Sequence, residues 1–394
     1  MKIVAVIHAK GQSNRVPRKN FRLINSVPLY LIQAINLSRI IPRSDIFIDS
    51  DDPEILHVSQ INGFVPLKRS KEYAQNSTGG VKLLELFLDQ IICDVVIQAF
   101  PPAPFLDEKS LKVMLSSIVD QNNNSSMIVN EDSLYVWKGE VPEYSFSKTG
   151  EIPNSIDLDK TKIELPTLYM VKSKQFLSSL SRTPKPCFQY KASKLMSVDI
   201  DFEEDLMIAK ALASTSRVSS LFSWSQNCRV MAPPILFLDV DGTLTDGFYN
   251  SSNQVELFKS FSTLDGTAVQ EIKKFGTKVC LVTASKSSKI LEQRAAIIGV
   301  DLLLDVQDKI SACQNYAREL GYSLGESAFI GNDVNDTSVL ESSGLPFCPK
   351  DSVSEVKNVA QTLDVKGGYG VCRSFVNFLK SERYETRRVL HEHA

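Results

Sequence analysis

The stretch 235–247 constrains the fold of this chain more than any other. Four apolar residues are followed at once by two carboxylates, Asp239 and Asp241, and then by Gly242. Short apolar runs that end in turn residues are typical of strands buried in an open α/β sheet. If the strand pattern persists through the turn, both carboxylates point the same way off the carboxyl end of the strand. Ligands bind at that edge of such sheets.

The spacing of the two carboxylates indicates their chemistry. Neighbouring carboxylates repel each other unless a cation lies between them, and Mg²⁺ favours carboxylates together with a phosphate. The segment therefore favours phosphoryl transfer, with Asp239 as the covalent nucleophile and Asp241 as the general acid and base. Gly242 permits a tight turn against the ligand. The competing interpretation is a strand that ends in a solvated, Asp-rich turn.

Three downstream segments fit the same site. Another apolar run, Val279–Thr283, ends in a hydroxyl that can hold a phosphate oxygen. Lys309 could neutralise phosphate charge, although an exposed lysine at a helix start is the ordinary alternative. A third apolar run ends before Asn332 and Asp333, which suit the completion of a Mg²⁺ shell. Asn and Asp at that position could also cap a helix, and the two roles are compatible.

These four pieces, in this order and spacing, resemble the haloacid dehalogenase phosphatase superfamily over about residues 233–380. The likeness is to its small cap-less group, which includes 3-deoxy-octulosonate 8-phosphate phosphatase. The segments that carry this likeness are Thr243–Gly247, Lys259–Gly266 and Gly367–Arg373. It implies Mg²⁺-dependent hydrolysis of a sugar phosphate, often by tetramers. Asn332 stands where the superfamily has Asp, and whether Asn332 or Asp333 binds the metal is left open.

A cationic loop follows the first apolar run of the chain, Lys2–Ile7. The loop extends from Lys10 to Asn20 and contains two lysines and two arginines together with glycine and serine. Cations and backbone N–H groups bind anionic oxygens, so the loop suits a nucleoside triphosphate. A basic surface loop is the alternative, because neither a Walker motif nor a G-x-G-x-x-G motif is present.

The loop resembles the signature of the sugar cytidylyltransferases that activate 3-deoxy-2-keto acids, and the resemblance covers about residues 1–215. The matching residues are Ala9, Gly11, Ser13, Pro17, Arg18, Lys19 and Asn20. The resemblance implies that Lys19 stabilises the departing pyrophosphate. It implies nucleotide contacts from Lys10, Gly11, Ser13, Asn14, Arg15, Arg18 and Asn20.

Further matches to this family follow in order along the chain. Asp51, Arg69 and Gln98 lie in segments that the resemblance assigns to nucleotide binding. Asp199 and Asp201, spaced i, i+2, match the metal-binding segment of the family. On one strand face they would hold Mg²⁺ against the triphosphate. After Gln98 the Thr, Ser and Arg usual in the family are absent, so the sugar is left open.

Global properties agree with an enzyme of two domains. A chain of 394 residues exceeds the size at which one hydrophobic core stops growing. The net charge of −2 gives no general electrostatic case for nucleic acid or acidic membranes. No apolar run approaches the ~20 residues of a transmembrane helix. Seven scattered cysteines without zinc spacing suit a reducing cytoplasm.

We therefore expect two doubly wound, Rossmann-like α/β domains, of nucleotidyltransferase type and then of cap-less haloacid dehalogenase type. The expected divisions are a transferase domain at 1–215, a linker at 216–234, a phosphatase domain at 235–380 and a charged tail at 381–394.

The expected function is bifunctional. One half transfers CMP from CTP to a 3-deoxy-2-keto sugar acid of sialic-acid type, releasing pyrophosphate, and the other hydrolyses a sugar-acid phosphate. Mg²⁺ in both domains and a homodimer or homotetramer are expected. Two alternatives remain: the C-terminal domain serves mainly oligomerisation, or the N-terminal domain only binds a nucleotide or sugar. Which sugar acid is used stays open.

Overall fold

The computed structural model describes residues 1–75, 77–144, 151–222, 224, 228–252, 255–286, 289–381, 383–387 and 389–392. Tertiary contacts divide the chain into two compact units. The N-terminal unit comprises Met1–Lys10 and Tyr30–Phe222, and the C-terminal unit comprises Gly11–Leu29 and Ser223–Ala394. Parts of the expected linker and tail, at positions 223, 225–227, 382, 388 and 393–394, lie outside the described residues.

The N-terminal unit is built on a seven-stranded sheet of order β11-β7-β10-β6-β1-β4-β5. Its strands are β1 (Ile3–His8), β4 (Ile46–Ser50), β5 (Val65–Lys68), β6 (Val95–Ala99), β7 (Ser125–Ser133), β10 (Lys160–Lys172) and β11 (Cys187–Lys191). β10 is antiparallel to both neighbours, while β1 is parallel to β4 and β6. The first strand is thus an interior strand with a neighbour on each side, and its carboxyl end lies at the point where the strand order reverses.

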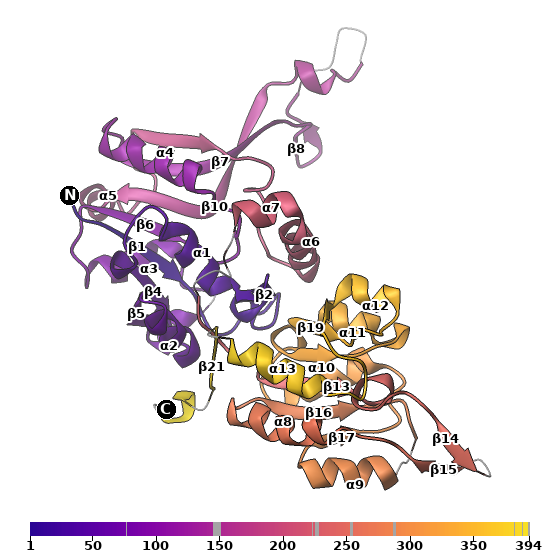
Figure 1. Ribbon diagram of the computed structural model, residues 1–394. Helices are drawn as coiled ribbons and strands as arrows, with labels where there is room; N and C mark the ends of the chain where they lie inside the picture. The colour runs from indigo at the N-terminus through magenta and orange to yellow at the C-terminus, as the bar shows by residue number, and fades with distance from the viewer. Residues whose placement is uncertain are drawn as a thin grey trace. The chain divides into compact units, whose positions relative to one another are not determined.

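Helices surround this sheet, as Figure 1 shows. They are α1 (Leu29–Leu37), α2 (Pro53–Ile61), α3 (Gly80–Leu88), α4 (Glu108–Val119), α5 (Ser173–Ser179), α6 (Glu203–Ser214) and α7 (Ser216–Leu221). β7 and β10 continue beyond the sheet into an arm that carries the short strands β8 (Trp137–Lys138) and β9 (Val141–Pro142). The helix α7 occupies the first part of the segment expected to be a linker.

The C-terminal unit contains a six-stranded parallel sheet of order β17-β16-β13-β18-β19-β20. Its strands are β13 (Ile235–Asp239), β16 (Lys278–Val282), β17 (Asp301–Leu303), β18 (Ala328–Ile330), β19 (Leu345–Cys348) and β20 (Gln361–Thr362). β13 comes first along the chain and lies between β16 and β18. The strand order therefore reverses at β13, which makes its carboxyl end the expected ligand site.

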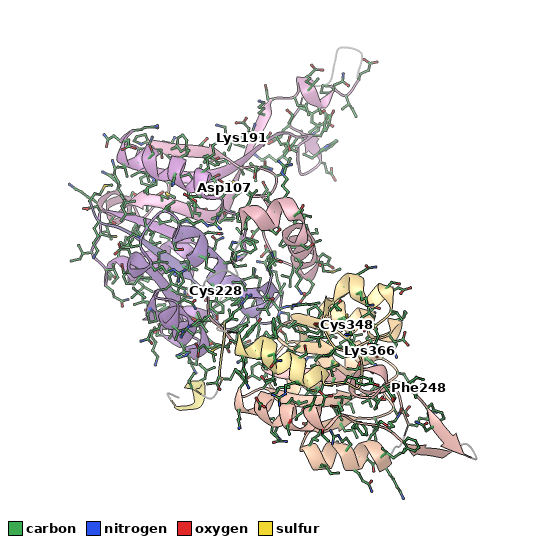
Figure 2. The ribbon with its side chains drawn as sticks, viewed as in Figure 1. Asp107, Lys191, Cys228, Phe248, Cys348 and Lys366 are labelled. Carbon is green, nitrogen blue, oxygen red and sulfur yellow. The ribbon has the colours of Figure 1, made fainter. Side chains whose placement is uncertain are left out.

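Most of the helices of this unit lie around the sheet (Figure 1). The helices are α8 (Thr263–Lys274), α9 (Lys289–Ile298), α10 (Lys309–Glu319), α11 (Thr337–Ser342), α12 (Ser354–Val359), α13 (Val371–Lys380) and α14 (Val389–Glu392). A hairpin of β14 (Asn250–Ser252) and β15 (Val255–Phe258) extends away from the sheet, and exposed Phe248 lies just before it (Figure 2). The other short pairs are β2 (Leu23–Ile24) with β3 (Val27–Pro28), and β12 (Val230–Met231) with β21 (Tyr384–Glu385).

Each unit has its own core beneath continuous apolar strands. In the N-terminal unit Val4, Val6 and Val96 pack with Phe87 of α3. In the C-terminal unit strand residues such as Phe237 and Phe329 are fully buried, as is Cys348 (Figure 2). Strands that are buried on both faces consist of unbroken apolar residues, so they could be located in the sequence as apolar runs. The expected fold class, two α/β domains with mainly parallel sheets, is confirmed.

The segment Gly11–Leu29 belongs to the C-terminal unit by its contacts, although β1 and most of α1 belong to the other unit. Arg18 Nε donates to Glu326 at 2.9 Å, and Arg383 donates to the Ser26 carbonyl oxygen. The cationic loop follows β1 along the chain, but it packs with the C-terminal unit and not with the sheet that contains β1. Within the described ranges, no helix is long and apolar enough to cross a bilayer.

Candidate active sites

Asp239 is the last residue of β13 and lies at the carboxyl edge of the C-terminal sheet. The strand ends there, and Val240–Leu244 form a distorted helical turn. The strand therefore ends before Asp241, although the Asp241 backbone is still extended, with φ −83° and ψ 114°, and the chain turns at Gly242, whose φ is +83°. Asp239 is buried, whereas the Asp241 side chain is 42% exposed. The two carboxylates thus occupy different environments.

Lys309 provides the positive charge of this site. Its Nζ lies 2.6 Å from Asp239 Oδ1 and 2.6 Å from Asp336 Oδ1, and all three side chains are buried. Burial alone would lower the pKa of Lys309, but the two carboxylates outweigh it and raise that pKa. The lysine is therefore not an exposed helix-start residue.

Asp239 carries a strongly shifted acidity. Burial raises its pKa to about 7, the charge of Asp336 adds to that effect, and Lys309 opposes it. The carboxylate of Asp336 also accepts hydrogen bonds from the backbone N–H groups of Asn332 and Asp333, at 2.9 and 3.2 Å. One buried acid thus holds both the lysine and the loop after β18.

Asn332 lies beside the same carboxylate. In the orientation that satisfies its neighbours, its amide nitrogen donates to Asp239 Oδ2 and to the Asp241 carbonyl oxygen, both at 3.0 Å. Turning the amide over would present its oxygen to the same place. A carboxylate, a backbone carbonyl and an amide oxygen are donors that Mg²⁺ accepts. The residues present therefore fit Mg²⁺ with the Asn332 amide turned over.

The alternative metal ligand, Asp333, faces away from this cluster. Its carboxylate accepts from the Val334 backbone N–H at 2.7 Å, and the residue is exposed. Asp333 therefore acts as the cap of the turn that follows β18, the role that Asp at such a position commonly takes.

Asp241 faces a second buried lysine. Lys259 Nζ lies 2.5 Å from Asp241 Oδ1, and the lysine side chain is only 4% exposed. The Ser285 hydroxyl lies 3.5 Å from Asp241 Oδ2. Thr283 follows β16, is buried, and accepts a hydrogen bond from the Ser285 backbone N–H at 3.1 Å. The hydroxyls and the acid thus meet at the same sheet edge.

Close backbone approach explains the glycines around this centre. A Cβ on Gly242 would overlap the Asn332 side chain, and one on Gly367 would overlap the Gly242 carbonyl group. The Gly368 backbone N–H donates to the Thr243 carbonyl oxygen at 2.9 Å. The glycine-rich segment that follows Lys366 therefore lies directly on the turn that follows Asp239 in its own chain.

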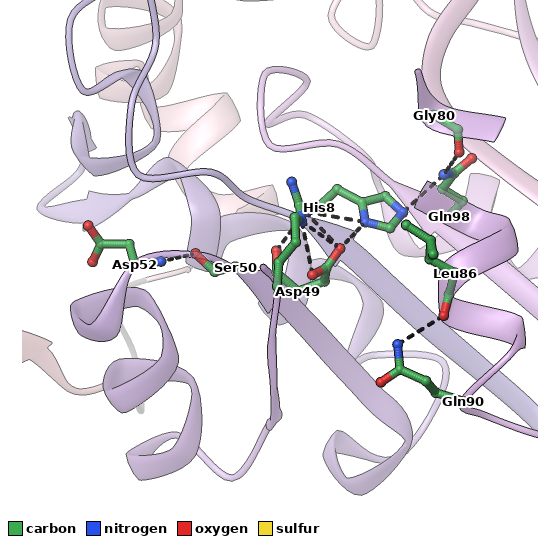
Figure 3. A network of polar contacts seen from close by, with 9 residues as sticks. His8, Asp49, Ser50, Asp52, Gly80, Leu86, Gln90 and Gln98 are labelled. Carbon is green, nitrogen blue, oxygen red and sulfur yellow. Dashed lines mark hydrogen bonds and ion pairs between the residues drawn. The ribbon is translucent and has the colours of Figure 1, made fainter. Parts of the chain in front are cut away.

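The edge of the N-terminal sheet carries a different network, shown in Figure 3. His8 Nδ1 lies 2.6 Å from Asp49 Oδ2, and Arg69 pairs with the same carboxylate at 2.7 Å. Gln98 Nε2 lies 3.0 Å from His8 Nε2 and donates to the Gly80 carbonyl oxygen. Burial lowers the pKa of His8. Burial alone would raise the pKa of Asp49, but hydrogen bonds from His8 and Arg69 outweigh it and lower that pKa.

Two of the expected nucleotide-binding residues are thus engaged inside the protein. Arg69 is committed to Asp49, and Gln98 is fully buried. The side-chain oxygen of Gln98 is buried without a hydrogen-bond partner among the described residues. Asp51, two residues after Asp49, is partly exposed.

The expected loop residues vary in exposure. Gly11 and Asn20 are buried, Asn14 and Arg15 are exposed, and Lys10, Ser13, Arg18 and Lys19 are half-buried. Lys19 begins the 3₁₀ turn Lys19–Phe21. The loop therefore presents cations of which several reach solvent.

Asp199 and Asp201 do not lie on a strand, so that expectation is wrong. The backbone there is irregular because it leads into α6, and the Asp201 N–H donates to Asp205 at 2.9 Å. The Ile200 N–H donates to the Pro102 carbonyl oxygen, and Ile200 is buried between two partly exposed acids. Searching the described residues finds no group of three or more His, Cys, Asp or Glu that could hold a metal ion.

Two residues of the C-terminal centre were not expected. Asp336 lies three residues beyond Asp333 and is buried on Lys309. Lys259 was noted only as part of a similar segment, yet it pairs with Asp241. The spacing of Asp333 and Asp336 was a usable signal, because one can cap a turn while the other points inward.

Comparisons with known proteins agree with this geometry. The chain matches the cytidylyltransferase family over residues 4–216 and the haloacid dehalogenase-like hydrolase family over residues 300–363. N-acylneuraminate cytidylyltransferase A of Danio rerio is 28% identical over 393 residues, covering 96% of this chain and 88% of that protein.

Two further relatives concern the C-terminal part. The 3-deoxy-D-manno-octulosonate 8-phosphate phosphatase of Haemophilus influenzae is 32% identical over 143 residues, covering 36% of this chain and 79% of that protein. A solved phosphatase of that name from Moraxella catarrhalis, in complex with magnesium, phosphate and KDO, is 23% identical. It covers 41% of this chain and 93% of its own length, with a TM-score of 0.37.

The transferase match extends over more than half of the chain, and most of the Haemophilus influenzae phosphatase is matched as well. The expected combination of two enzyme families in one chain is thereby confirmed. The chain belongs to the cytidylyltransferase family and joins that transferase to a haloacid dehalogenase-type phosphatase domain.

Proposed function

We propose that the C-terminal unit hydrolyses a sugar-acid phosphate through a phosphoaspartate at Asp239. The observation that carries this proposal is the buried cluster of Asp239, Lys309 and Asp336 beside the Asn332 amide. Lys309 offsets the charge of the nucleophile and of the arriving phosphoryl group. Mg²⁺ held by Asp239, the Asp241 carbonyl and Asn332 would further neutralise the phosphoryl oxygens.

The two steps of hydrolysis then follow from the residues present. An Asp239 oxygen attacks phosphorus, and the sugar oxygen departs with a proton from Asp241. Asp241, now ionised, takes a proton from water, which attacks the phosphoaspartate and releases inorganic phosphate. Thr283 holds a phosphoryl oxygen. The partial exposure of Asp241 suits this role, because the acid must meet both the leaving group and water.

For the N-terminal half, the proposed reaction is CMP transfer from CTP to a 3-deoxy-2-keto sugar acid of sialic-acid type. The anomeric hydroxyl attacks the α-phosphorus, and pyrophosphate leaves. Lys19, with Lys10 and Arg15, stabilises the charge on pyrophosphate. Asp199 and Asp201 supply two carboxylates, a donor set that fits Mg²⁺ bound to a triphosphate.

The remaining loop and sheet-edge residues are proposed to contact the nucleotide. They are Gly11, Ser13, Asn14, Arg18, Asn20, Asp51, Arg69 and Gln98. The transferase domain is taken as residues 1–215, and the working assembly is a homo-oligomer. Dephosphorylation and CMP transfer have a chemical logic in one chain, because a phosphorylated sugar acid must lose its phosphate before or around its activation.

The test uses the full-length protein with CTP, Mg²⁺ and a panel of unphosphorylated 3-deoxy-2-keto sugar acids. Pyrophosphate release with one acid supports the transferase and identifies its substrate. Phosphate release from the corresponding sugar-acid phosphates is measured in parallel. No pyrophosphate with any acid contradicts the transferase proposal.

A second candidate is favoured by Asn332, which replaces a charged metal ligand with a neutral one. In that case the C-terminal unit mainly supports oligomerisation. Pyrophosphate release without any phosphatase turnover, at saturating Mg²⁺, would support this candidate over the phosphatase.

A further inference from the structure

The cationic loop depends on the C-terminal unit for its position. Along the chain it connects β1 to α1, yet Gly11–Leu29 makes its contacts within the C-terminal unit. The proposed function assigns to this loop the lysine that stabilises departing pyrophosphate. The residues that hold the loop therefore control where that lysine lies.

One anchor of the loop is an ion pair between Arg18 and Glu326. Arg18 Nε donates to both carboxylate oxygens, at 2.9 and 3.0 Å, and its guanidinium lies 3.9 Å from the Phe21 ring centroid. Glu326 is itself held, because it accepts from the Ser323 N–H at 2.9 Å and from the Ser323 hydroxyl at 2.8 Å. A buried acid whose lone pairs are satisfied makes a strong partner for one arginine.

Arg18 adopts a conformation that needs such a partner. Its φ is +50° and its ψ is +39°, which is the left-handed region that side chains other than glycine rarely occupy. Strained residues of this kind persist where the surroundings hold them, often at functional sites. Arg18 immediately precedes the turn Lys19–Phe21. Its conformation therefore sets the direction in which Lys19 leaves the loop.

A second contact lies beside the first. Gly325 packs so closely on buried Arg22 that a Cβ there would overlap the Arg22 guanidinium. The φ of Gly325 is not in the left-handed region, so an alanine could adopt the same backbone conformation. The space beside it is too small for the alanine methyl group. An added methyl group would displace the loop without removing any charge.

We propose that Glu326 is a positioning residue for CMP transfer: it clamps Arg18 in the left-handed conformation and thereby places Lys19. This inference rests on the proposed transferase function. It goes beyond that function by making the transferase depend on a residue outside both proposed centres. In the described part of the chain the side chain of Glu326 pairs with Arg18 and Ser323, neither of which is assigned to phosphate hydrolysis.

The test compares full-length variants in both assays. In Glu326→Gln, which keeps one acceptor for Ser323, we expect the kcat of pyrophosphate release to fall about 10- to 100-fold, because small misplacements of catalytic groups have effects of this size. The sugar-acid KM and phosphate release should stay near wild type. Gly325→Ala should give the same pattern. Glu319→Gln, an exposed acid at the end of α10, is the matched control and should change neither activity.

Unchanged pyrophosphate release in both variants would overturn the inference. A parallel loss of both activities together with a lower Tm would also overturn it, because Glu326 would then serve only the stability of its unit. A wild-type protein that releases no pyrophosphate with any acid is a separate result, which contradicts the proposed transferase itself.

Discussion

The carboxyl edges of the two sheets are organised differently. At the edge of β13, the carboxylates of Asp239 and Asp336 meet Lys309 Nζ at 2.6 Å, beside the Asn332 amide. At the edge of β1, the buried groups His8, Asp49 and Arg69 pair with one another, and the cationic loop makes its contacts within the other unit. The charges at the β13 edge converge on one lysine, while the buried charges at the β1 edge neutralise one another.

This difference reflects the size and charge of the two proposed substrates. A single phosphoryl group needs a compact site, which strand ends of one sheet can supply with little reorganisation. A nucleoside triphosphate is longer and more highly charged, so its own phosphates can draw separate cations together. We therefore expect mutations at the β13 edge to have local and severe effects, and mutations around the loop to be more graded.

The sharpest test of separate centres is Asp239→Asn. Because the amide cannot act as the nucleophile, phosphatase turnover should fall by about 10³-fold or more, while CMP transfer stays unchanged. Phosphate and pyrophosphate release are measured on the same preparation. Loss of both activities in a folded variant would show that the two centres are not independent.

A somewhat smaller effect is expected from Lys19→Met. Removing a cation that stabilises the departing pyrophosphate should lower the kcat of CMP transfer by about 10²–10³-fold, with phosphatase activity retained. Lys174→Met, an exposed lysine on α5, is the control. Full transfer activity in the Lys19 variant would remove this lysine from the proposed mechanism.

Asn332→Asp tests whether a neutral ligand weakens the metal site. An added carboxylate beside Asp239 Oδ2 should tighten Mg²⁺ binding by about tenfold, since site charge tunes the affinity of such sites. The measurement is the Mg²⁺ concentration that gives half-maximal phosphatase activity. An unchanged Mg²⁺ requirement would place the metal away from this residue.

The smallest expected effect is on the pH dependence of stability without metal. The folded-state pKa of Asp239 is raised to about 7, above its ordinary value, so the folded protein holds this proton more tightly than the unfolded chain. Its contribution to stability is full at low pH and is lost as pH rises through about 7. In EDTA, Asp239→Asn should therefore raise the Tm of the C-terminal unit by a few degrees at pH 8 relative to wild type.

The same comparison at pH 5 provides the control for this effect. There the wild-type carboxyl group is protonated, so the Tm difference should shrink. A difference independent of pH would mean that ionisation of Asp239 does not drive it. Adding Mg²⁺ at pH 8 should stabilise the wild type and narrow the gap.

Much of the fold was predictable because buried parallel strands consist of consecutive apolar residues, which are visible in the sequence. The runs before Asp239 and Asn332, and the one ending at Thr283, each mark a strand whose carboxyl end lies at the site. Strand ends in one parallel sheet meet at one edge, so these residues could be grouped without a structure. The same reasoning failed for Asp199 and Asp201, because an i, i+2 spacing does not by itself specify a strand.

The pairings between charges could not be predicted in this way. The spacing of Asp333 and Asp336 allows one of them to point inward, but it does not identify Lys309 as the partner of buried Asp336. Likewise Arg69 follows a strand in a manner that suits a ligand, yet it pairs with Asp49 of the neighbouring strand. The partner of each charge depends on which side chains the packed structure buries away from water.

The sequence by itself determined the two α/β domains, the strand-end carboxylate Asp239 and the family of each half, because these depend on local patterns and motif spacing. Only the tertiary structure decided which acid holds Lys309, that the Asn332 amide meets Asp239 and Asp241, and that Glu326 pairs with Arg18. These contacts join residues up to 308 positions apart. Charges separated so widely along the chain find partners only when burial forces each to be paired, and that is a property of the packed molecule.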